Sequence, residues 1–364
     1  MFGFGKKKYD NDPFCSYPFE NVEIRPTGEV YFCCQGWIRE NSIGNIYKTP
    51  FHEIWNSDTA RAIRRSILNG DYKFCDRKIC GFCPARHPEV HILGAVDGHY
   101  ALPPKTVFFA PSYECNLSCV VCRKDRIFTS DARLNKLKSQ IDSVFLPIFS
   151  GVESVGFSGS GDPFADRFCR ELVGRTAASY PNIRFFFHTN GVLASPEMLQ
   201  SLGVLNRMNN IQVSLHSATS ETWKKFTRGS DDQYSALMDN LKFISDLRRD
   251  GRLPYFVLSF VVASFNYHEL IDFVRLAQSL GADKISVWGY RNGGSVYDGV
   301  ADEVEGANIQ TDAEASAFSV HTPPHAEYGK LGEILRHPVF SDPKIELYPE
   351  IKKIRDEALQ EAGV

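Results

Sequence analysis

Three cysteines, Cys115, Cys119 and Cys122, fall within one short stretch of the chain. Thiolates are soft ligands that favour iron–sulfur clusters or zinc. Three protein ligands leave one coordination position open, which a catalytic centre needs and a structural centre avoids. The spacing therefore predicts a catalytic iron–sulfur cluster. A three-cysteine zinc site completed by a distant histidine is the alternative.

A second group of cysteines lies within the first 85 residues. Its members are Cys15, Cys33, Cys34, Cys75, Cys80 and Cys83. In a reducing cytosol, clustered cysteines bind metals or act in catalysis more often than they form disulfides. This group therefore predicts a second metal centre, and zinc is the alternative for the closely spaced pair Cys80 and Cys83.

Length and composition place the chain among globular proteins. Its 364 residues suggest two domains, or one large domain with an appendage. The hydrophobic fraction of 43% and the charged fraction of 23% exclude a disordered or fibrous chain. With 41 basic and 44 acidic residues, the net charge of -3 provides no basic field for nucleic acid.

The apolar segments indicate neither a membrane span nor a secretory signal. The longest, residues 255–265, is far shorter than the roughly 20 residues that a bilayer span needs. The first ten residues, MFGFGKKKYD, lack the apolar core of a secretory signal. We therefore expect a soluble, cytoplasmic protein with no membrane and no nucleic-acid partner.

Between residues 105 and 290, short apolar runs alternate with helical patterns. The runs are typical of buried strands and cover residues 106–110, 152–158, 183–188, 211–215, 256–262 and 285–290. Helices are predicted at 166–179 and 267–280, with Gly281 as the C-terminal cap of the second. This alternation predicts parallel βα units, in an open sheet or in part of a barrel.

The two flanks of this array have different patterns. The N-terminal flank predicts a hairpin around residues 26–28 and helices at 49–55 and 58–68, and its prolines at 84–104 mark a boundary. Residues 292–329 carry seven acidic residues and no Lys or Arg, which predicts a long loop. Helices are expected at 331–335 and 351–359. We therefore divide the chain into residues 1–100, 101–290 and 291–364.

The motif Cys115-x3-Cys119-x2-Cys122, at the end of a first strand and before a βα array, resembles the radical S-adenosylmethionine (radical SAM) superfamily. Similar segments of that family follow the later strands. Here they are residues 159–163, which resemble a Gly-Gly-Glu-Pro loop, and residues 189–191, 214–219 and 226–229. The resemblance covers residues 105–290. It implies an α/β fold with a partial (βα)6 barrel.

The resemblance implies that Cys115, Cys119 and Cys122 bind a four-iron four-sulfur cluster that also binds SAM. The implied SAM contacts are Ser160, Gly161, Asp162, Thr189, Asn190, Ser214, His216 and Arg228. Two positions differ from the family pattern, because Val121 replaces an aromatic residue and Asp162 replaces a glutamate. For Arg228, a surface salt bridge is the alternative to pairing with the SAM carboxylate.

The N-terminal cysteines resemble the SPASM/twitch auxiliary-cluster module, a small α+β unit. The matching features are the Cys15-x17-Cys33 pair around a hairpin, residues 44–46 and 53–55, and Cys80-x2-Cys83. The resemblance implies a second four-iron four-sulfur cluster, with Cys15, Cys33, Cys80 and Cys83 as ligands and Cys34 and Cys75 as alternates. In the family the module usually follows the barrel, whereas here it precedes it.

These resemblances imply an oxidoreductase that cleaves SAM to a 5′-deoxyadenosyl radical and abstracts a substrate hydrogen. The auxiliary cluster would handle an electron in a net oxidative modification of a peptide. The alternatives are dehydrogenation or epimerisation of a sugar or aminocyclitol, and a non-catalytic zinc or iron–sulfur scaffold. A reduced flavodoxin or ferredoxin is the expected electron donor.

Cys169, alone on a predicted helix, is interpreted either as a small buried apolar residue or as a thiol that donates a hydrogen atom to a substrate radical.

Overall fold

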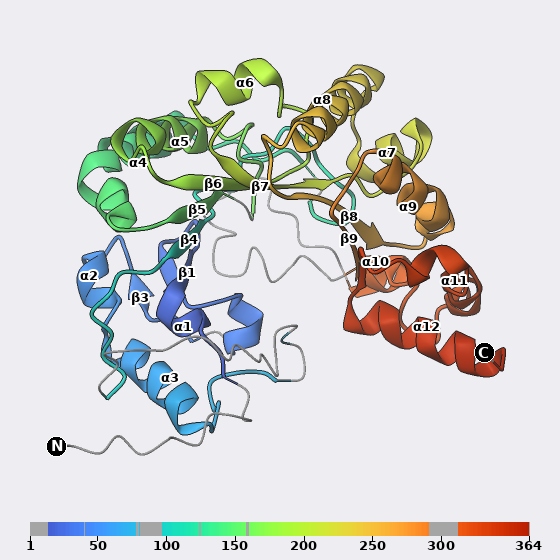
Figure 1. The fold of residues 1–364 in the computed structure, drawn as a ribbon, viewed down its shortest axis with the longest axis horizontal. Coiled ribbons are helices and arrows are strands. Elements are labelled where there is room, and N and C mark those ends of the chain that lie inside the picture. The colour runs from blue at the N-terminus through green and yellow to red at the C-terminus, as the bar shows by residue number, and fades with distance from the viewer. Residues whose placement is uncertain are drawn as a thin grey trace.

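The structure is a computed structural model that describes residues 14–39, 41–77, 80, 97–123, 125–157, 160–290 and 312–363. Within these residues, ten strands form one sheet in the order β10-β9-β8-β7-β6-β5-β4-β1-β2-β3 (Figure 1). The strands are β1 (Asn21–Ile24), β2 (Glu29–Tyr31), β3 (Gly44–Asn45), β4 (Thr106–Phe109), β5 (Ser154–Phe157), β6 (Arg184–Thr189), β7 (Met208–Ser214), β8 (Phe256–Val262), β9 (Lys284–Gly289) and β10 (Ile345–Leu347).

The centre of the sheet confirms the predicted βα array. Strands β4 to β9 are the six predicted strands, and each pairs in parallel with the next. Helices between them lie along the outside of the curved sheet (Figure 1). They are α4 (Asp131–Ser139), α5 (Arg167–Ser179), α6 (Pro196–Ser201), α7 (Ser220–Thr227), α8 (Asp231–Arg249) and α9 (Leu270–Ser279). The curved parallel sheet with helices on its outer face is a partial barrel.

Local sequence signals explain where two of these helices begin and end. Asp166 caps α5, because its Oδ1 accepts hydrogen bonds from the backbone nitrogens of Phe168 and Cys169 at 2.8 and 2.9 Å. Gly281 follows α9 with a φ of +73°, a left-handed conformation that favours glycine. Both observations confirm the predicted helix limits to within a few residues.

The N-terminal module joins the same sheet rather than standing apart from it. Strand β1 pairs in parallel with β4, with Asn21 opposite Thr106, and β2 and β3 continue in antiparallel fashion. The predicted hairpin at residues 26–28 is confirmed between β1 and β2. The α-helices of this module are α1 (Tyr17–Glu20), α2 (Phe51–Ile54) and α3 (Asp58–Asn69). Because the sheet is continuous here, the division at residue 100 stays a prediction.

The C-terminal part differs from the expected long loop. Residues 291–311 lie outside the described residues, but residues 312–318 form the helix α10 (Asp312–Phe318). Phe318 at its end contacts the rings of Phe265 and Tyr290, with centroid distances of 5.5 and 5.8 Å. This apolar anchor, together with several alanines, outweighs the acidic composition that predicted a loop.

The last elements of the chain lie at the edge of the sheet next to β9, opposite the N-terminal module. The predicted helices there are confirmed as α11 (Tyr328–Leu335) and α12 (Pro349–Glu361), while β10 was not predicted. Strand β10 pairs in parallel with β9 over three residue pairs. A strand this short is defined by its partner and not by its own alternation of residues.

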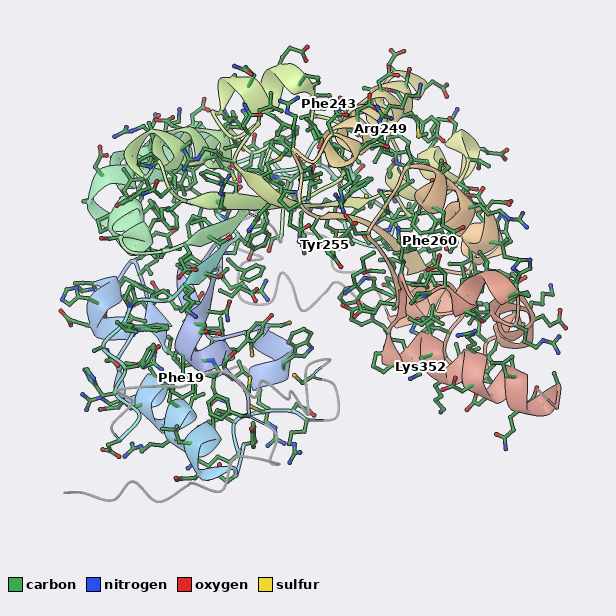
Figure 2. All side chains as sticks on the ribbon, in the orientation of Figure 1. Phe19, Phe243, Arg249, Tyr255, Phe260 and Lys352 are labelled. Carbon is green, nitrogen blue, oxygen red and sulfur yellow. The ribbon has the colours of Figure 1, made fainter. Side chains whose placement is uncertain are left out.

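A single apolar core runs from the N-terminal module to the C-terminal helices. Phe19 belongs to this core in the N-terminal module, and Phe260, on β8, belongs to it near the C-terminal helices (Figure 2). Within the described residues, no helix is long and apolar enough to cross a membrane.

Packing on the sheet generates a prediction about Gly156 in β5. A Cβ atom at this position would lie 1.6 Å from Cζ of Phe186, whose ring packs on Phe108 at 4.5 Å. We expect Gly156→Ala to lower the free energy of unfolding by about 1–3 kcal/mol, because the Phe186 ring must move. Chemical denaturation of the metal-free protein measures this loss.

Gly174, inside α5, is the matched control, since a Cβ there would meet nothing within 4 Å. Gly174→Ala should raise the free energy of unfolding by roughly 0.5–1 kcal/mol, because alanine loses less backbone entropy in a helix. Equal stability of the two variants would contradict the packing described for Gly156.

Candidate active site and metal centres

The loop with Cys115, Cys119 and Cys122 follows the C-terminal end of β4 and is held from two sides. On one side, the backbone nitrogen of Asp162 donates to the Glu114 carbonyl at 2.9 Å. On the other side, the nitrogens of Ser118 and Val120 donate to the carbonyls of Thr227 and Phe226 at 3.3 and 2.9 Å. The loop is thus clamped between the segment after β5 and the end of α7.

The three thiols of this loop form no disulfide and are partly buried. Burial is the main cause that raises the pKa of Cys115 to about 11, and it also raises the pKa of Cys119. Among the described residues, no three His, Cys, Asp or Glu side chains are placed to hold a single metal ion. A four-iron cluster binds each thiolate to a different iron, so its ligands stand further apart than those of one ion.

Arg123 is a buried residue beside this loop that sequence reasoning missed. Its guanidinium donates to the carbonyls of Tyr113 and Ser160 at 2.7 and 2.5 Å. It also donates to Sγ of Cys122 at 3.5 Å, and its positive charge works against the raised pKa of Cys115. A basic residue directly after the third cysteine was the available signal. Arg123 therefore brings a positive charge to the thiols.

The segment after β5 approaches the cysteine loop closely. A Cβ at Gly161 would lie 2.4 Å from the Glu114 carbonyl oxygen, so glycine is needed for this approach. Ser160 is buried beside it, and Gly159, the first residue of the predicted SAM-binding motif, lies outside the described residues. The predicted contacts Ser160 and Gly161 thus lie against the cysteine loop.

Asp162 is a buried carboxylate that holds two predicted SAM segments together. Its Oδ2 accepts hydrogen bonds from Thr189 Oγ1 and from the Asn190 nitrogen, both at 2.8 Å. Its Oδ1 accepts from the nitrogens of Phe164 and Ala165 at 3.0 and 3.2 Å. Burial raises the Asp162 pKa, while these donors oppose that shift. The carboxylate therefore positions Thr189 and Asn190.

Asn190 connects this network to the cluster ligands. Its Nδ2 donates to Asn116 Oδ1 at 2.8 Å and lies 3.7 Å from Sγ of Cys115. The structure therefore brings the predicted residues Asn190, Asp162 and Cys115 together at the C-terminal ends of β4, β5 and β6.

The end of β7 supplies Ser214 and His216. Ser259 Oγ donates to Ser214 Oγ at 3.4 Å, and the backbone nitrogen of Val261 donates to His216 Nδ1 at 3.1 Å. The His216 ring stacks on Phe226 with a centroid distance of 4.7 Å, and burial lowers its pKa to about 4. His216 is therefore a neutral side chain with a fixed orientation at pH 7.

Arg228 ends α7 in the left-handed conformation, with a φ of +56°, and its side chain is exposed. It directly follows Thr227, whose carbonyl accepts from Ser118 of the cysteine loop. The predicted SAM residue Arg228 is therefore the neighbour in the chain of a residue that contacts the cysteine loop directly.

Four of the N-terminal cysteines line one cavity, together with Tyr17, Pro18, Trp37, Ile38 and Tyr72. They are Cys15, Cys33, Cys75 and Cys80. They come from three places: before α1, after β2, and after α3. Cys34 is not among the lining residues, and Cys83 lies outside the described residues. The structure thus brings Cys75, an alternate in the sequence-based set, together with three of its first choices.

Electrostatics indicate how close these four thiols are. Burial, followed by the thiols of Cys15, Cys75 and Cys80, raises the pKa of Cys33. Burial and neighbouring cysteines also raise the pKa of Tyr17 to about 12. Four partly buried thiols, three of which disfavour the ionisation of Cys33, form a donor set that a multi-iron core would stabilise.

Cys169 lies in α5 and is fully buried in the apolar core. Burial raises the pKa of its thiol well above the ordinary value. This environment favours the apolar packing interpretation over the hydrogen-donor one.

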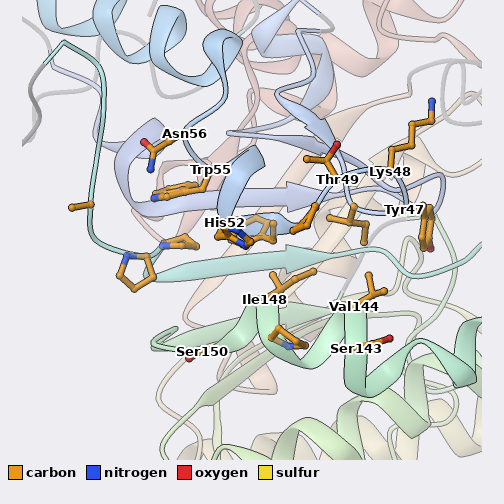
Figure 3. A pocket seen from close by; sticks show the side chains of 17 residues that line it. Tyr47, Lys48, Thr49, His52, Trp55, Asn56, Ser143, Val144, Ile148 and Ser150 are labelled. Carbon is orange, nitrogen blue, oxygen red and sulfur yellow. The ribbon is translucent and has the colours of Figure 1, made fainter.

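A separate cavity of about 740 Å³ lies between α2 and residues 143–150 of the barrel (Figure 3). Its lining combines Tyr47, Phe51 and Trp55 with four prolines, and the described residues of the lining include Lys48 but no acidic residue. None of these described lining residues is a cysteine, so the cavity is distinct from the two groups of thiols that the structure describes.

The Asp162 network generates a prediction. Asp162→Asn replaces an oxygen acceptor by a donor that faces the donors on residues 164–165 or 189–190. We expect the free energy of unfolding to fall by about 1–3 kcal/mol, because buried donors lose their acceptor. Asp131→Asn is the control: Asp131 is 86% exposed and pairs with Arg167, so its loss should cost less than about 1 kcal/mol. Equal losses would contradict the role assigned to Asp162.

A second prediction concerns pH. Burial lowers the pKa of His188, on β6, from 6.5 to about 4. Between these values the unfolded chain takes up a proton that the folded chain does not, so stability falls as the pH falls from 6.5 to 4. We expect His188→Gln to flatten this part of the pH profile of unfolding. Replacement of His52, whose side chain is 82% exposed, serves as the control and should leave the profile unchanged.

Comparison with known proteins identifies two domains. The family model described as the radical SAM superfamily matches residues 109–277. The model described as an iron–sulfur cluster-binding domain, SPASM, matches residues 15–84.

Curated relatives match only in part. A probable GTP 3′,8-cyclase of Saccharolobus islandicus is 30% identical over 176 residues, which cover 48% of this chain and 53% of the relative. The probable GTP 3′,8-cyclase of Saccharolobus solfataricus is 28% identical over 178 residues, with the same coverage. The chain thus spans about half the length of the curated relatives that it matches.

Among solved structures, Streptococcus suis SuiB bound to the precursor peptide SuiA is 14% identical. The match covers 82% of this chain and 56% of that chain, with a TM-score of 0.43. Residues 109–277 thus match the radical SAM superfamily, and residues 15–84, on the N-terminal side of that region, match the SPASM iron–sulfur cluster-binding domain.

Proposed function

We propose that this protein is a radical SAM oxidoreductase that abstracts a hydrogen from a peptide and completes a net oxidation with a second cluster. The observation that carries the proposal is the clamped loop of three half-buried thiols. That loop is hydrogen-bonded to the segment after β5 on one side and to the end of α7 on the other. Both neighbours contain the residues that resemble SAM-binding segments.

The residues of this site fit a four-iron cluster with one open iron. Cys115, Cys119 and Cys122 would be its ligands. Arg123, whose Nη2 lies 3.5 Å from the Cys122 sulfur, would balance part of the negative charge of the cluster. When bound, the two clusters and SAM supply a 5′-deoxyadenosyl radical and an acceptor for one electron, which together permit a two-electron oxidation of the substrate.

The protein itself contributes orientation. Asp162 fixes Thr189 and Asn190, and the Val261 nitrogen fixes the His216 ring. Ser214 and Arg228 stand at the end of β7 and the end of α7. In parallel βα folds the binding residues gather at the carboxyl ends of the strands, and these residues share that edge. We assign them the role of holding the SAM methionyl and ribose groups.

For the auxiliary cluster we assign Cys15, Cys33, Cys75 and Cys80 as ligands, because these four line one cavity. Four protein ligands leave no open iron, which suits electron transfer and not substrate binding. The pairing of β1 with β4 fixes this module against the barrel. A fixed position suits a site that exchanges electrons with the barrel.

A peptide is the substrate class that we propose, because modules that resemble SPASM accompany radical SAM enzymes that act on peptides as well as those that act on sugars or aminocyclitols. The cavity between α2 and residues 143–150 lies at the amino ends of β4 and β5, at the opposite edge of the sheet from the cysteine loop, so we do not assign it to the substrate (Figure 3). The match to the GTP 3′,8-cyclases covers about half of those proteins, so it does not extend their substrate to this chain. A sugar or aminocyclitol stays the alternative substrate.

The ligand assignment predicts the iron content of anaerobically reconstituted protein. Wild type should hold about eight irons per chain, and Cys75→Ser should hold about four, because one four-iron cluster loses a ligand. Cys34→Ser is the matched control and should keep all the iron, because Cys34 is next to Cys33 but is not among the described residues that line the cavity. Iron and sulfide analysis measures this. Loss of iron in Cys34→Ser with retention in Cys75→Ser would overturn the assignment.

The reaction class is tested by 5′-deoxyadenosine release from SAM with a strong reductant. Cys115→Ser should abolish release, since it removes a ligand of the SAM-binding cluster. Peptides, an aminocyclitol and GTP are then compared as additives. Acceleration by peptides alone supports the proposal, whereas acceleration by GTP or by the aminocyclitol alone would overturn the substrate class. Zinc in place of iron, without nucleoside release, would leave a metal-binding scaffold.

A further inference from the structure

Arg64, on α3, carries a charge for which the described residues supply no counterion. Its side chain is 0% exposed. Nε donates to the Pro18 carbonyl at 2.7 Å, and Nη1 donates to the Trp55 carbonyl at 2.9 Å and to Asn56 Oδ1 at 3.0 Å. All of these acceptors are neutral. Nη2 has no hydrogen-bond partner among the described residues.

Aromatic rings surround the same guanidinium. Its carbon lies 4.2 Å from the Trp55 ring centroid and 4.7 Å from that of Phe32, with Phe19 and Tyr100 at 5.9 and 5.8 Å. Ring faces attract a cation but do not neutralise it. Burial lowers the Arg64 pKa to about 9, so the group is still charged at pH 7. A buried cation without a counterion is costly, and proteins normally pair it.

The guanidinium lies behind the wall of the four-cysteine cavity. Pro18, whose carbonyl accepts from Nε, is one of the residues that line this cavity. Phe32, whose ring faces the guanidinium, directly precedes the lining residue Cys33. The labelled Phe19 in Figure 2 marks this part of the N-terminal module. The set of four thiols, reached through Pro18 and Cys33, is thus a site that could carry a compensating negative charge.

We propose that Arg64 is the buried countercharge of the auxiliary cluster, and that it raises the reduction potential of that cluster. This inference rests on the proposed function in one respect, which is that Cys15, Cys33, Cys75 and Cys80 hold a cluster. Four thiolates around a four-iron four-sulfur core give a net negative charge. Reduction adds one more negative charge, and a nearby cation in a medium of low dielectric constant favours it.

The first test is the reduction potential of the auxiliary cluster in the full-length chain. Replacement of Cys115, Cys119 and Cys122 by serine removes the other cluster, so that an EPR-monitored redox titration reports the auxiliary cluster alone. In this background, Arg64→Met should shift the potential to more negative values. Arg64→Lys keeps the charge and should stay close to the parent. A potential that is identical in all three proteins would overturn the inference.

Arg207 provides a matched control in the barrel. It also donates to backbone carbonyls, those of Ala177 and Ile183, and its guanidinium lies 5.0 Å from the Phe185 ring. It stands on the far side of β4 and β5 from the N-terminal module in the strand order. Arg207→Met should lower stability without moving the potential. A shift as large as that of Arg64→Met would mean that general loosening, and not charge, is the cause.

A second readout does not depend on redox chemistry. Thermal unfolding of the metal-free and the iron-loaded protein gives the gain in melting temperature on loading. This gain should be smaller in Arg64→Met than in the parent, because loading no longer compensates a buried charge. Equal gains would overturn the inference. If the parent itself binds no iron at the N-terminal cysteines, the proposed auxiliary cluster fails, which is a different outcome from an unchanged potential.

Discussion

The parallel pairing of β1 with β4 is the interaction on which the arrangement of both metal sites depends. It places Asn21 opposite Thr106 and Ile24 opposite Phe109, so the N-terminal module and the barrel share one sheet. Cys15 precedes β1, and Cys33 follows the antiparallel β2, so both lie toward the amino end of β4. Cys115 follows its carboxyl end. A four-residue strand spans about 13 Å, which separates the two groups of thiols along the sheet.

Two kinds of residue surround the cysteine loop, and they differ in what they can do. Asp162 has its carboxylate oxygens occupied by protein donors, and His216 has Nδ1 occupied by the Val261 nitrogen. Such residues fix loops and cannot readily exchange protons. Asn190, by contrast, reaches a cluster ligand directly. The chemistry of the proposed reaction is therefore supplied by the cofactors, and the buried polar residues maintain the geometry in which the cofactors bind.

Much of the barrel was predictable from the sequence, because its strands and helices depend on local patterns of residues. The strands from β4 to β9 are short apolar runs, and their parallel order follows from the helices between them. The set of auxiliary ligands was not predictable to the same degree. Cys75 follows Phe74 in a segment without periodicity. The chain after α3 returns to residue 37, where the Asp76 nitrogen donates to the Trp37 carbonyl at 2.7 Å, and this return brings Cys75 to the cavity that it shares with Cys33. In the same way, α10 depends on the contact of Phe318 with Phe265 and Tyr290, which no local pattern contains.

Buried arginines give the two metal sites a common electrostatic principle. Arg123 donates to carbonyl groups and to the sulfur of Cys122, and Arg64 donates to carbonyl groups behind Cys33. The described residues give Arg64 no carboxylate partner, so carbonyl dipoles and aromatic rings hold its guanidinium in place without neutralising its charge. Each cysteine group thus has a fixed positive charge beside it, which lowers the cost of gathering several thiolates inside a protein.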